Sequence, residues 1–430
     1  MPRILVMSAD AMVFQDTELL RTLPGYKKYL AGGSEIKSVR SIYPTVTYPA
    51  HVTMATGAFP EKHGVISNFP LAPNVSPAPW NWFHEANKCD DIFSAAKRAG
   101  YSTSTVFWPV TACHPDIDYL IPEYWTQSKT ESVIDAFRRA GSDEYSISLI
   151  KEIEDRIKAV ERTHPGIEYL EIELACRMIR EKKPEVMLLH PGNIDGYRHA
   201  KGLFGEHVDK GIRETDEFIS MLGQALEDAG VLEDTDIFLV SDHGQLEIKR
   251  AININCLLAD RGLMEVGSDG KILSWKAYCA STGMSAHIYL SDPEDKRLYD
   301  KVYALLCELR DEGVYGFSSF MTRQEAIEKE HLDGPFSFVI ETDGYTSFGE
   351  SPVRPLVRTY SSNDYRFGNA THGYHPDKGP QPFLIAKGPH IAKGVVLEKS
   401  AIVHQAPTYA KILGVELRDA QGKAIEEILR

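Results

Sequence analysis

The stretch Ile237-Phe238-Leu239-Val240-Ser241-Asp242-His243-Gly244 decides the fold class of this chain. Its first five residues are typical of a buried β-strand, and the turn that follows carries two potential metal ligands. A second predicted strand, Ile4–Ser8, runs into Asp10 in the same way, and a third, Val186–His190, runs into a polar loop. Side chains at the carboxyl ends of parallel strands share one crevice, so these segments indicate an α/β sheet with a site at that edge.

The rest of the chain alternates between the same two kinds of element. Further strands are predicted at Ser102–Phe107, Ala286–Leu290, Phe336–Ile340 and Phe383–Ala386. Helices are predicted at Asp91–Ala99, Ile147–Arg162, Tyr169–Glu181, Val208–Ala229, Lys296–Glu312 and Ala406–Leu413. Strands that alternate with helices predict a layered α/β fold. We expect one catalytic domain over residues 1–430, with a lid or insert within about 250–365.

Composition excludes several classes of protein. The 430 residues are 43% hydrophobic and 25% charged, which is ordinary for a globular domain and rules out wholesale disorder. The 61 acidic residues against 47 basic ones give a net charge of −14, which argues against a nucleic-acid platform. Six cysteines without CxxC spacing predict reduced thiols. No apolar run approaches the ~20 residues of a membrane span or forms a signal-peptide core, so we expect no membrane partner and a cytoplasmic location.

Five potential metal ligands lie at or near the predicted strand ends, and a sixth, His372, lies in Thr371-His372-Gly373-Tyr374. Asp195 and His199, four residues apart, share one face if their segment forms a helical turn. With Asp10, Asp242, His243 and His372 they make three carboxylates and three imidazoles. Mixed nitrogen and oxygen ligands suit zinc, six of them suit two ions, and manganese would tolerate the carboxylates. Taken singly, each motif has a structural alternative: a solvated helical pair, a capped turn or a helix cap.

A candidate nucleophile precedes a predicted helix start. In Thr47-Tyr48-Pro49-Ala50-His51, Pro49 suits the first turn of a helix, which places Thr47 just before the helix N-terminus. That end favours an anionic nucleophile or a phosphate, and metal coordination can activate a hydroxyl. Thr45 and Thr53 are rival hydroxyls, and Thr47 itself could be an ordinary cap. Asn68 could donate its amide to a phosphate oxygen, or it could be a turn asparagine.

These motifs, in this order, resemble the alkaline phosphatase superfamily, and most closely its nucleotide pyrophosphatase/phosphodiesterase family. The matching segments are Thr47 to His51, His63-Gly64-Val65 with Asn68, Asp195 to His199, Asp242-His243-Gly244, and His372-Gly373-Tyr374. The resemblance spans nearly the whole chain. It implies an alkaline-phosphatase-like three-layer sandwich, in which a central, mostly parallel sheet is flanked by helices.

The resemblance also implies roles for these residues. Asp195, His199 and His372 would hold one zinc ion, and Asp10, Asp242 and His243, with Thr47, the other. Thr47 would attack phosphorus and form a phosphothreonine intermediate, and Asn68 would steady the phosphoryl oxygen. Tyr48 stands beside the nucleophile, where an aromatic ring can stack on a substrate base; the alternative is a core aromatic.

The implied activity is zinc-dependent hydrolysis of a small-molecule phosphodiester or nucleotide pyrophosphate. Alternatives are a phosphonate or phosphomonoester hydrolase with the same metals, a phosphosugar mutase, and an inactive binding protein. Three departures from the family pattern, Val46, Ala50 and Arg198, lie where the pocket meets the leaving group. Arg198 could contact a carboxylate or second phosphate of the substrate, or it could be a solvated helix-face arginine. The sequence leaves the natural substrate, the physiological metal and the oligomeric state open.

Overall fold

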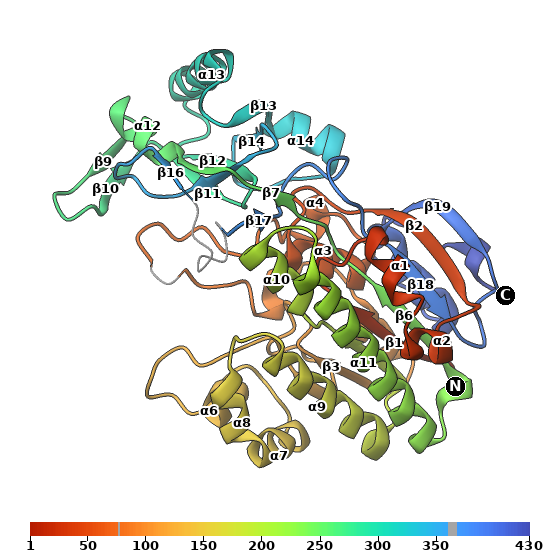
Figure 1. Ribbon diagram of the computed structural model, residues 1–430. Helices are drawn as coiled ribbons and strands as arrows, with labels where there is room; N and C mark the ends of the chain where they lie inside the picture. Colours follow the sequence, from red (N-terminus) through yellow and green to blue (C-terminus); the bar gives the residue numbers. More distant parts are fainter. Residues whose placement is uncertain (76–77, 360–367) are drawn as a thin grey trace.

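A computed structural model describes residues 1–75, 78–359 and 368–430. An eight-stranded sheet with the order β19-β2-β18-β6-β1-β5-β3-β4 runs through its centre (Figure 1). The strands are β1 (Arg3–Ser8), β2 (Ser34–Arg40), β3 (Thr103–Val106), β4 (Tyr119–Ile121), β5 (Val186–Leu189), β6 (Thr235–Val240), β18 (Leu384–Lys387) and β19 (Val396–Ala401). Only β18 runs against its neighbours, so the mostly parallel sheet predicted from the sequence is confirmed.

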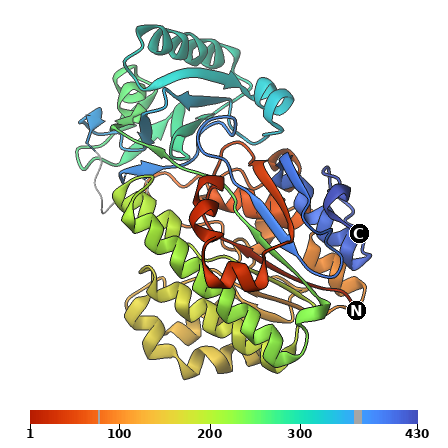
Figure 2. The ribbon, with the colours of Figure 1, turned by 45° about the vertical axis from the view of Figure 1, so that its right-hand side comes forward.

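Both faces of this sheet are buried, because successive side chains of each apolar strand point to opposite sides. Leu5 and Met7 of β1 belong to one hydrophobic core, and Ile4 and Val6 belong to the other. Helices cover each face, which gives three layers (Figure 2). The expected three-layer sandwich is confirmed.

The helices divide between the two faces. The first core is shared with α2 (Pro24–Tyr29), α6 (Val133–Arg139), α7 (Glu144–Glu152), α8 (Glu154–Val160), α9 (Gly166–Lys182) and α11 (Glu206–Ala229). The second is shared with α3 (Thr47–Thr56), α5 (Ile92–Arg98) and α15 (Gln405–Leu413). Short helices α1 (Thr17–Leu20) and α10 (Asn193–Lys201) lie in the segments that follow β1 and β5, and α4 (Pro60–His63) follows α3.

Residues 250–358 form a lobe beyond the sheet, drawn at the top of Figure 1. Its antiparallel sheet has the order β11-β12-β14-β13, and α13 packs in the same core. Its elements are β8 (Arg250–Asn253), α12 (Ile254–Asp260), β9 (Met264–Val266), β10 (Ile272–Trp275), β11 (Ala277–Ser281), β12 (Ser285–Leu290), α13 (Lys296–Glu312), β13 (Phe317–Thr322), α14 (Arg323–Glu330), β14 (Phe338–Thr342), β15 (Thr346–Gly349) and β16 (Val357–Arg358). A lid role for this segment stays a prediction, and residues 360–365 of the predicted insert lie outside the described residues.

The predicted element bounds agree with the structure apart from a few positions. The segment predicted as one helix over 147–162 is two helices, because Ile153 leaves the helical region (φ −118°, ψ 15°). Ile150, Ile153 and Ile157 all remain buried, so the apolar spacing continues across the break and hides it. Strands β2 and β19 were not predicted, because polar and charged residues are interspersed through both sequences; β19 is the edge strand, and β2 pairs with it and with β18.

The fold brings the predicted strand ends together. In the parallel register Met7 pairs with Leu189 and Ser8 with Val240, so β1, β5 and β6 end at one level. Two further short strands, β7 (Leu246–Glu247) and β17 (Ala370–Thr371), pair antiparallel just beyond β6. This pairing brings the segment before His372 to the same edge of the sheet.

Two other sequence expectations can be compared with the structure. All six cysteines are free, and four of them are buried. Within the described residues, every helix is too short or too polar to cross a lipid bilayer.

Candidate active site

Two clusters of potential metal ligands lie side by side at the carboxyl edge of the sheet. The ligand atoms of Asp195, His199 and His372 lie within 4.8 Å of one another, and so do those of Asp10, Asp242 and His243. The rings of His243 and His372 stack with their centroids 4.1 Å apart, which joins the clusters. The structure therefore brings together all six residues singled out in the sequence, in the two groups that the resemblance implied.

The hydrogen bonds of the histidines suit a bound cation. His199 Nδ1 lies 2.8 Å from the carbonyl of Ala370, and His372 Nδ1 lies 3.2 Å from that of Thr45. A carbonyl only accepts, so Nδ1 carries the proton and Nε2 presents a lone pair. His199 Nε2 lies 3.2 Å from an oxygen of Asp195, where the ring either donates to the carboxylate as an imidazolium or, when neutral, shares a cation with it.

The buried carboxylates of the second cluster, Asp10 and Asp242, also suit a bound cation. Asp10 and Asp242 are 4% and 0% exposed, and Oδ1 of Asp10 and Oδ2 of Asp242 accept no hydrogen bond within the described residues. Burial, followed by the neighbouring Asp195 charge, raises the pKa of Asp10 well above its usual range. Burial and the charge of Asp10 do the same to the pKa of Asp242. Buried carboxylates of this kind require a counter-charge, and the residues present fit two divalent cations.

The first cluster has a different electrostatic balance. Burial alone would raise the pKa of Asp195, but the nearby His199 and His372 lower it well below its usual range. Burial lowers the pKa of His372 to about 4 and also lowers that of His243, so both rings stay neutral near pH 7. A carboxylate beside neutral imidazoles is the ligand form that zinc takes.

The positions of the three threonines distinguish the candidate nucleophile. The helix α3 begins at Thr47, with Val46 as its N-cap. Thr47 therefore lies inside the first turn, whereas the sequence predicted it just before the helix. Its Oγ1 lies 3.2 Å from His243 Nε2, beside the second cluster. Thr45 donates its hydroxyl to the carbonyl of Tyr374, and Thr53 contacts His63 inside the helix. Only Thr47, of the three, presents its hydroxyl to the metal clusters.

Asn68 is held in a defined orientation next to Thr47. Its Oδ1 accepts a hydrogen bond of 2.8 Å from the backbone N–H of Tyr48. The amide nitrogen is left to donate, as the sequence analysis predicted for a phosphoryl oxygen. Asn68 lines a small hollow together with His199 and His372.

The Tyr48 ring is fully buried and contacts Trp80, with ring centroids 5.2 Å apart. Trp80, and not Tyr48, lines the adjacent cavity. The core-aromatic alternative for Tyr48 therefore describes its packing here, and stacking on a substrate stays a prediction. The aromatic ring that faces the cavity at this point is Trp80.

Several polar residues around the site were not singled out in the sequence. His190 Nε2 lies 3.0 Å from Asp10 Oδ2, and His51 connects the carbonyl of Thr47 with the hydroxyl of Ser8. Gln245 donates to the side chain of Asp195. His190 follows β5 directly, so the strand-end rule that identified Asp10 also applied to it. His51 and Gln245 are recognisable only from the three-dimensional contacts.

Arg198 occupies neither of its predicted environments. It is fully buried, and its Nη2 lies 2.8 Å from both carboxylate oxygens of Asp16. Asp16 also accepts from the backbone N–H of Val13, in the loop that carries Asp10. Arg198 is therefore shielded from solvent, and it joins the helix of Asp195 and His199 to the loop of Asp10.

One glycine beside the site is required by its surroundings. Gly373 follows His372 with φ at +95°, and a Cβ there would lie 1.7 Å from the carbonyl of Thr282. Any side chain would displace this turn and His372 with it. The backbone therefore accounts for the glycine of the His-Gly-Tyr motif.

A third cluster of histidine and aspartate lies on the α3 side of the sheet. His84, Asp91 and His114 approach one another within 4.8 Å. His114 Nδ1 accepts from the N–H of Asp116, so its proton is on Nε2, which donates to Asp91 over 2.9 Å. Asp91 also caps α5 through the N–H of Ser94. The hydrogen bonds of His114 and Asp91 are made within the protein, so we interpret this cluster as a structural hydrogen-bond network.

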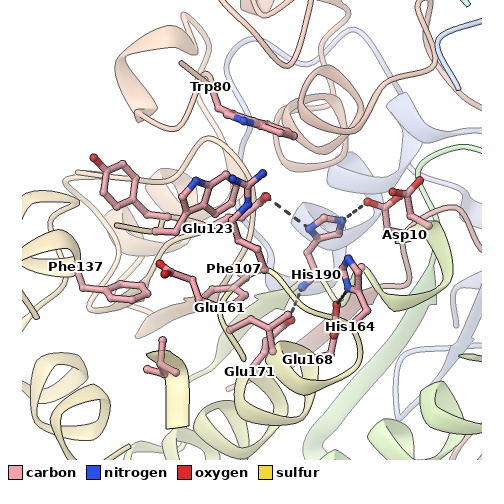
Figure 3. A pocket seen from close by; sticks show the side chains of 17 residues that line it. Asp10, Trp80, Phe107, Glu123, Phe137, Glu161, His164, Glu168, Glu171 and His190 are labelled. Carbon is pink, nitrogen blue, oxygen red and sulfur yellow. Dashed lines mark hydrogen bonds and ion pairs between the residues drawn. The ribbon is translucent and has the colours of Figure 1, made fainter. Parts of the chain in front are cut away.

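A cavity of about 170 Å³ opens beside the metal clusters and shares Asp10 and Asp195 with them (Figure 3). Trp80, Phe107 and Phe137 contribute aromatic surface, and four glutamates also line the cavity. His190 links the two regions, because it contacts Asp10 on one side and lies 3.8 Å from Glu123 on the other. A group attached to a phosphoryl centre at the clusters would extend into this space.

Comparison with known proteins finds related sequences and structures. The family model described as type I phosphodiesterase / nucleotide pyrophosphatase matches residues 4–339. An ectonucleotide pyrophosphatase/phosphodiesterase of Caenorhabditis elegans is 23% identical over 423 residues, 96% of this chain and 47% of that protein. Human ectonucleotide pyrophosphatase/phosphodiesterase family member 1 is 26% identical over 245 residues, 55% of this chain and 23% of its own length. The chain therefore spans about half or less of the length of these relatives.

Solved structures share the fold. Murine ectonucleotide pyrophosphatase / phosphodiesterase 5 aligns over 100% of both chains, with a TM-score of 0.68 and 18% identity. An inactive threonine-to-alanine variant of the same murine protein, in complex with AMP, aligns with a TM-score of 0.69 and 17% identity.

Proposed function

Because the chain belongs to the type I phosphodiesterase / nucleotide pyrophosphatase family, we propose that it hydrolyses small-molecule phosphodiesters or nucleotide pyrophosphates through Thr47. One observation carries the proposal: Thr47 begins a helix and presents its hydroxyl to the junction of two buried, cation-demanding clusters. The helix N-terminus favours the negative charge of a phosphoryl group at that point. The AMP bound by the murine relative supports a nucleotide as one substrate type.

We propose that Asp195, His199 and His372 hold one zinc ion, and that Asp10, Asp242 and His243 hold a second. The ions, when bound, would lower the pKa of the Thr47 hydroxyl and stabilise negative charge on the phosphoryl oxygens. Manganese is the alternative metal, because half of the donor set is carboxylate.

Thr47 Oγ would form a bond to phosphorus while the bond from phosphorus to the leaving oxygen breaks. The hydroxyl proton passes to solvent, and the leaving alcohol or phosphate takes a proton from solvent. Water then bonds to phosphorus, the Oγ–P bond breaks, and Thr47 regains its proton. His51 fixes the first turn of α3 by its 2.8 Å contact with the Thr47 carbonyl, and Asn68 would donate to a phosphoryl oxygen.

The cavity beside the site favours diesters over monoesters. Its lining includes four glutamates, and a monoester dianion would bring an additional negative charge next to them. A diester carries one charge and has a second organic group to fill the cavity. A phosphomonoester or phosphonate hydrolase would share the same clusters, and this lining supports the diester proposal over those two alternatives.

Thr47→Ala tests the assigned nucleophile. We expect turnover of a bis-aryl phosphodiester to fall by at least about 10³-fold, while zinc content by elemental analysis stays near two per chain. Thr53→Ala, which alters a hydroxyl inside the same helix, is the matched control. If Thr47→Ala retained turnover with both ions bound, direct attack by water would replace the proposed mechanism. A protein that takes up no zinc would instead support the binding-protein alternative.

A further inference from the structure

The turn that carries the candidate metal ligand His372 lies between two other parts of the chain. On one side is the nucleophile segment, residues 43–47, and on the other is the hairpin turn between β11 and β12 of the lobe. The N–H of Gly373 donates to the carbonyl of Thr45 over 2.9 Å, and the carbonyl of His372 accepts from the N–H of Met284 over 2.9 Å. One peptide group is therefore bonded to both neighbours, and its orientation depends on the lobe.

The backbones of the lobe and of this turn meet without room for a side chain. Gly283 of the hairpin turn has φ at +90°, and a Cβ there would lie 2.3 Å from the carbonyl oxygen of His372. Gly373 has the same restriction, since a Cβ on it would meet the carbonyl of Thr282. The carbonyl of Gly283 accepts from the N–H of Phe348 over 2.8 Å. The hairpin turn is therefore held from within the lobe as well as by its contact with the metal site.

Ser285, the first residue of β12, adds a side-chain contact to this junction. It is 0% exposed, and its Oγ donates to the carbonyl of Gly373 over 2.5 Å. A carbonyl only accepts, so the hydroxyl of Thr282, 2.6 Å away, donates to Ser285 Oγ. The direction of the Ser285 hydroxyl is thereby set toward the turn of the metal ligand.

Glu341 pairs with Ser285 across β12 and β14, at the same end of the lobe sheet. It is 4% exposed, and its Oε1 accepts from the backbone N–H of His375, just after His372, over 3.1 Å. Its Oε2 accepts from the hydroxyl of Tyr43, in the nucleophile segment, over 2.9 Å. One carboxylate of the lobe is therefore bonded to the ligand turn and to the nucleophile segment at once.

A lysine compensates the charge of this buried carboxylate. Lys378 Nζ lies 2.7 Å from Glu341 Oε1, and it also donates to the carbonyl of Thr342. Burial raises the pKa of Glu341, and the charge of Lys378 opposes that effect. Hydrogen bonds to an ionised carboxylate are shorter and stronger than those to a neutral acceptor. The lobe therefore holds the two segments through its strongest type of contact.

We propose that Ser285 and Glu341 are positioning residues, through which the lobe sets the place of the His372 ring in the first metal cluster and of the nucleophile segment beside it. The proposal rests on the proposed function, because it takes His372 as a metal ligand. His372 Nδ1 lies 3.2 Å from the Thr45 carbonyl, so the ring, its peptide group and both flanking segments are connected. A displaced lobe would move this ring relative to its two partner ligands.

Zinc affinity tests the role of Ser285. Ser285→Ala removes the hydroxyl and leaves the backbone hydrogen bonds of the hairpin turn in place. Loss of a group that orients a metal ligand typically lowers metal affinity 10–100-fold, and we expect a fall in that range for one of the two ions. Competition with a chelator measures it, and the other ion should keep its wild-type affinity. Unchanged affinity for both ions would overturn the role of Ser285.

Asn255→Ala is the control for general damage to the lobe. Asn255 is fully buried, and its amide bonds to the backbone of Cys279 and to the carbonyl of Glu350, inside the lobe. We expect this variant to lose at least as much stability to urea as Ser285→Ala while keeping both zinc affinities. An equal loss of zinc affinity in the control would mean that any loosening of the lobe suffices, which would contradict the proposal.

A double variant shows whether Ser285 acts through His372. His372→Ala removes one ligand of the first cluster. If Ser285 only positions that ligand, adding Ser285→Ala should change zinc affinity by less than about 2-fold. A further fall as large as in the single variant would place the effect of Ser285 elsewhere and overturn the proposal.

Glu341→Gln tests the second contact. Glutamine has nearly the same size, but its amide nitrogen donates, so it cannot accept from all three donors. We expect weaker zinc binding and, at saturating zinc, a kcat for a bis-aryl phosphodiester lowered about 10-fold with little change in KM, because the nucleophile segment is displaced. If this variant does not fold, Tyr43→Phe removes one hydroxyl from the same contact and should lower kcat in the same way. Wild-type kcat in Tyr43→Phe would overturn the role of Glu341.

These measurements separate failure of this proposal from failure of the proposed function, because zinc binding is measured without substrate. Loss of one ion in Ser285→Ala, in a protein that hydrolyses no diester, would support the positioning role and refute the proposed function. Diester hydrolysis by the wild type, with wild-type zinc affinities in both Ser285→Ala and Glu341→Gln, would refute the positioning role alone. A wild-type protein that binds no zinc would overturn both.

Discussion

Arg198→Met should weaken both the fold and the metal site. Arg198 is 0% exposed, and its Nη2 makes a pair of 2.8 Å hydrogen bonds to the carboxylate of Asp16. Loss of the guanidinium would leave the carboxylate of Asp16, which is 4% exposed, with the Val13 N–H as its remaining hydrogen-bond donor within the described residues. Breaking a buried ion pair by removing one member costs about 3–5 kcal/mol, and we expect a loss of this size.

The same substitution should also weaken metal binding, because Arg198 lies between the metal ligands Asp195 and His199 on α10. Asp16 lies in the stretch that follows Asp10, so the ion pair sets the distance between the two ligand groups. Loss of a group that orients metal ligands typically lowers metal affinity 10–100-fold, and we expect a fall in that range. Arg198 is in these terms a positioning residue.

Urea unfolding and competition with a zinc chelator measure the two effects separately. Arg156→Met, which breaks an exposed ion pair with Glu173, is the control and should cost less than about 1 kcal/mol. The double variant Asp16→Asn with Arg198→Met should lose less than the sum of the single changes, because burial already raises the pKa of Asp16 despite the guanidinium. Loss of stability no greater than in Arg156→Met would refute the reasoning about burial. Loss of stability with unchanged zinc affinity would refute the positioning role.

Three further outcomes follow from buried groups. Removal of zinc with a chelator should lower the midpoint of urea unfolding, because the aspartates of the two clusters then lose their counter-charge. Added zinc should restore the midpoint, since free zinc at 1,000 times Kd adds about 4 kcal/mol to the free energy of unfolding. An unfolding midpoint that does not change with the chelator would argue against zinc bound at the two clusters. His287 is fully buried, neither ring nitrogen has a hydrogen-bond partner within the described residues, and burial lowers its pKa to about 3. The unfolded chain gains this proton below about pH 6.5, so stability falls as pH drops from 6.5 toward 3, by about 2 kcal/mol at pH 5. His287→Phe should remove that share of the acid loss in urea melts at pH 7 and pH 5, and an unaltered difference would contradict it. Asp91→Ala should cost about 3 kcal/mol through the lost α5 cap and the lost bond to His114, with zinc affinity unchanged. A fall in zinc content in this variant would mean that the third cluster holds metal.

The sequence is sufficient to predict the centre of the fold. Strands β1, β5 and β6 are continuous apolar runs buried on both faces, and such runs are readable without a structure. The polar residues that follow them are predicted to meet, because parallel strands end at one edge. For that reason five of the ligand candidates could be named in advance, whereas His372 was named from its His-Gly-Tyr motif.

Other features depend on contacts between distant segments. The burial of Arg198 is decided by Asp16, which lies 182 positions earlier in the chain, and its immediate neighbours give no sign of a buried cation. Tyr48 is covered by Trp80, so the ring that faces the cavity belongs to a loop. The break at Ile153 is hidden because apolar spacing continues across it. The predicted cytoplasmic location and the single-domain boundary stay predictions.

The most direct test of the central claim is kcat/KM for a bis-aryl phosphodiester and its matching aryl monoester, measured side by side with zinc-loaded protein. The acidic lining of the cavity disfavours a dianion and its volume accommodates a second ester group, so we predict a diester preference of at least about 10-fold. A preference for the monoester would contradict the phosphodiesterase account, even with both clusters filled by zinc.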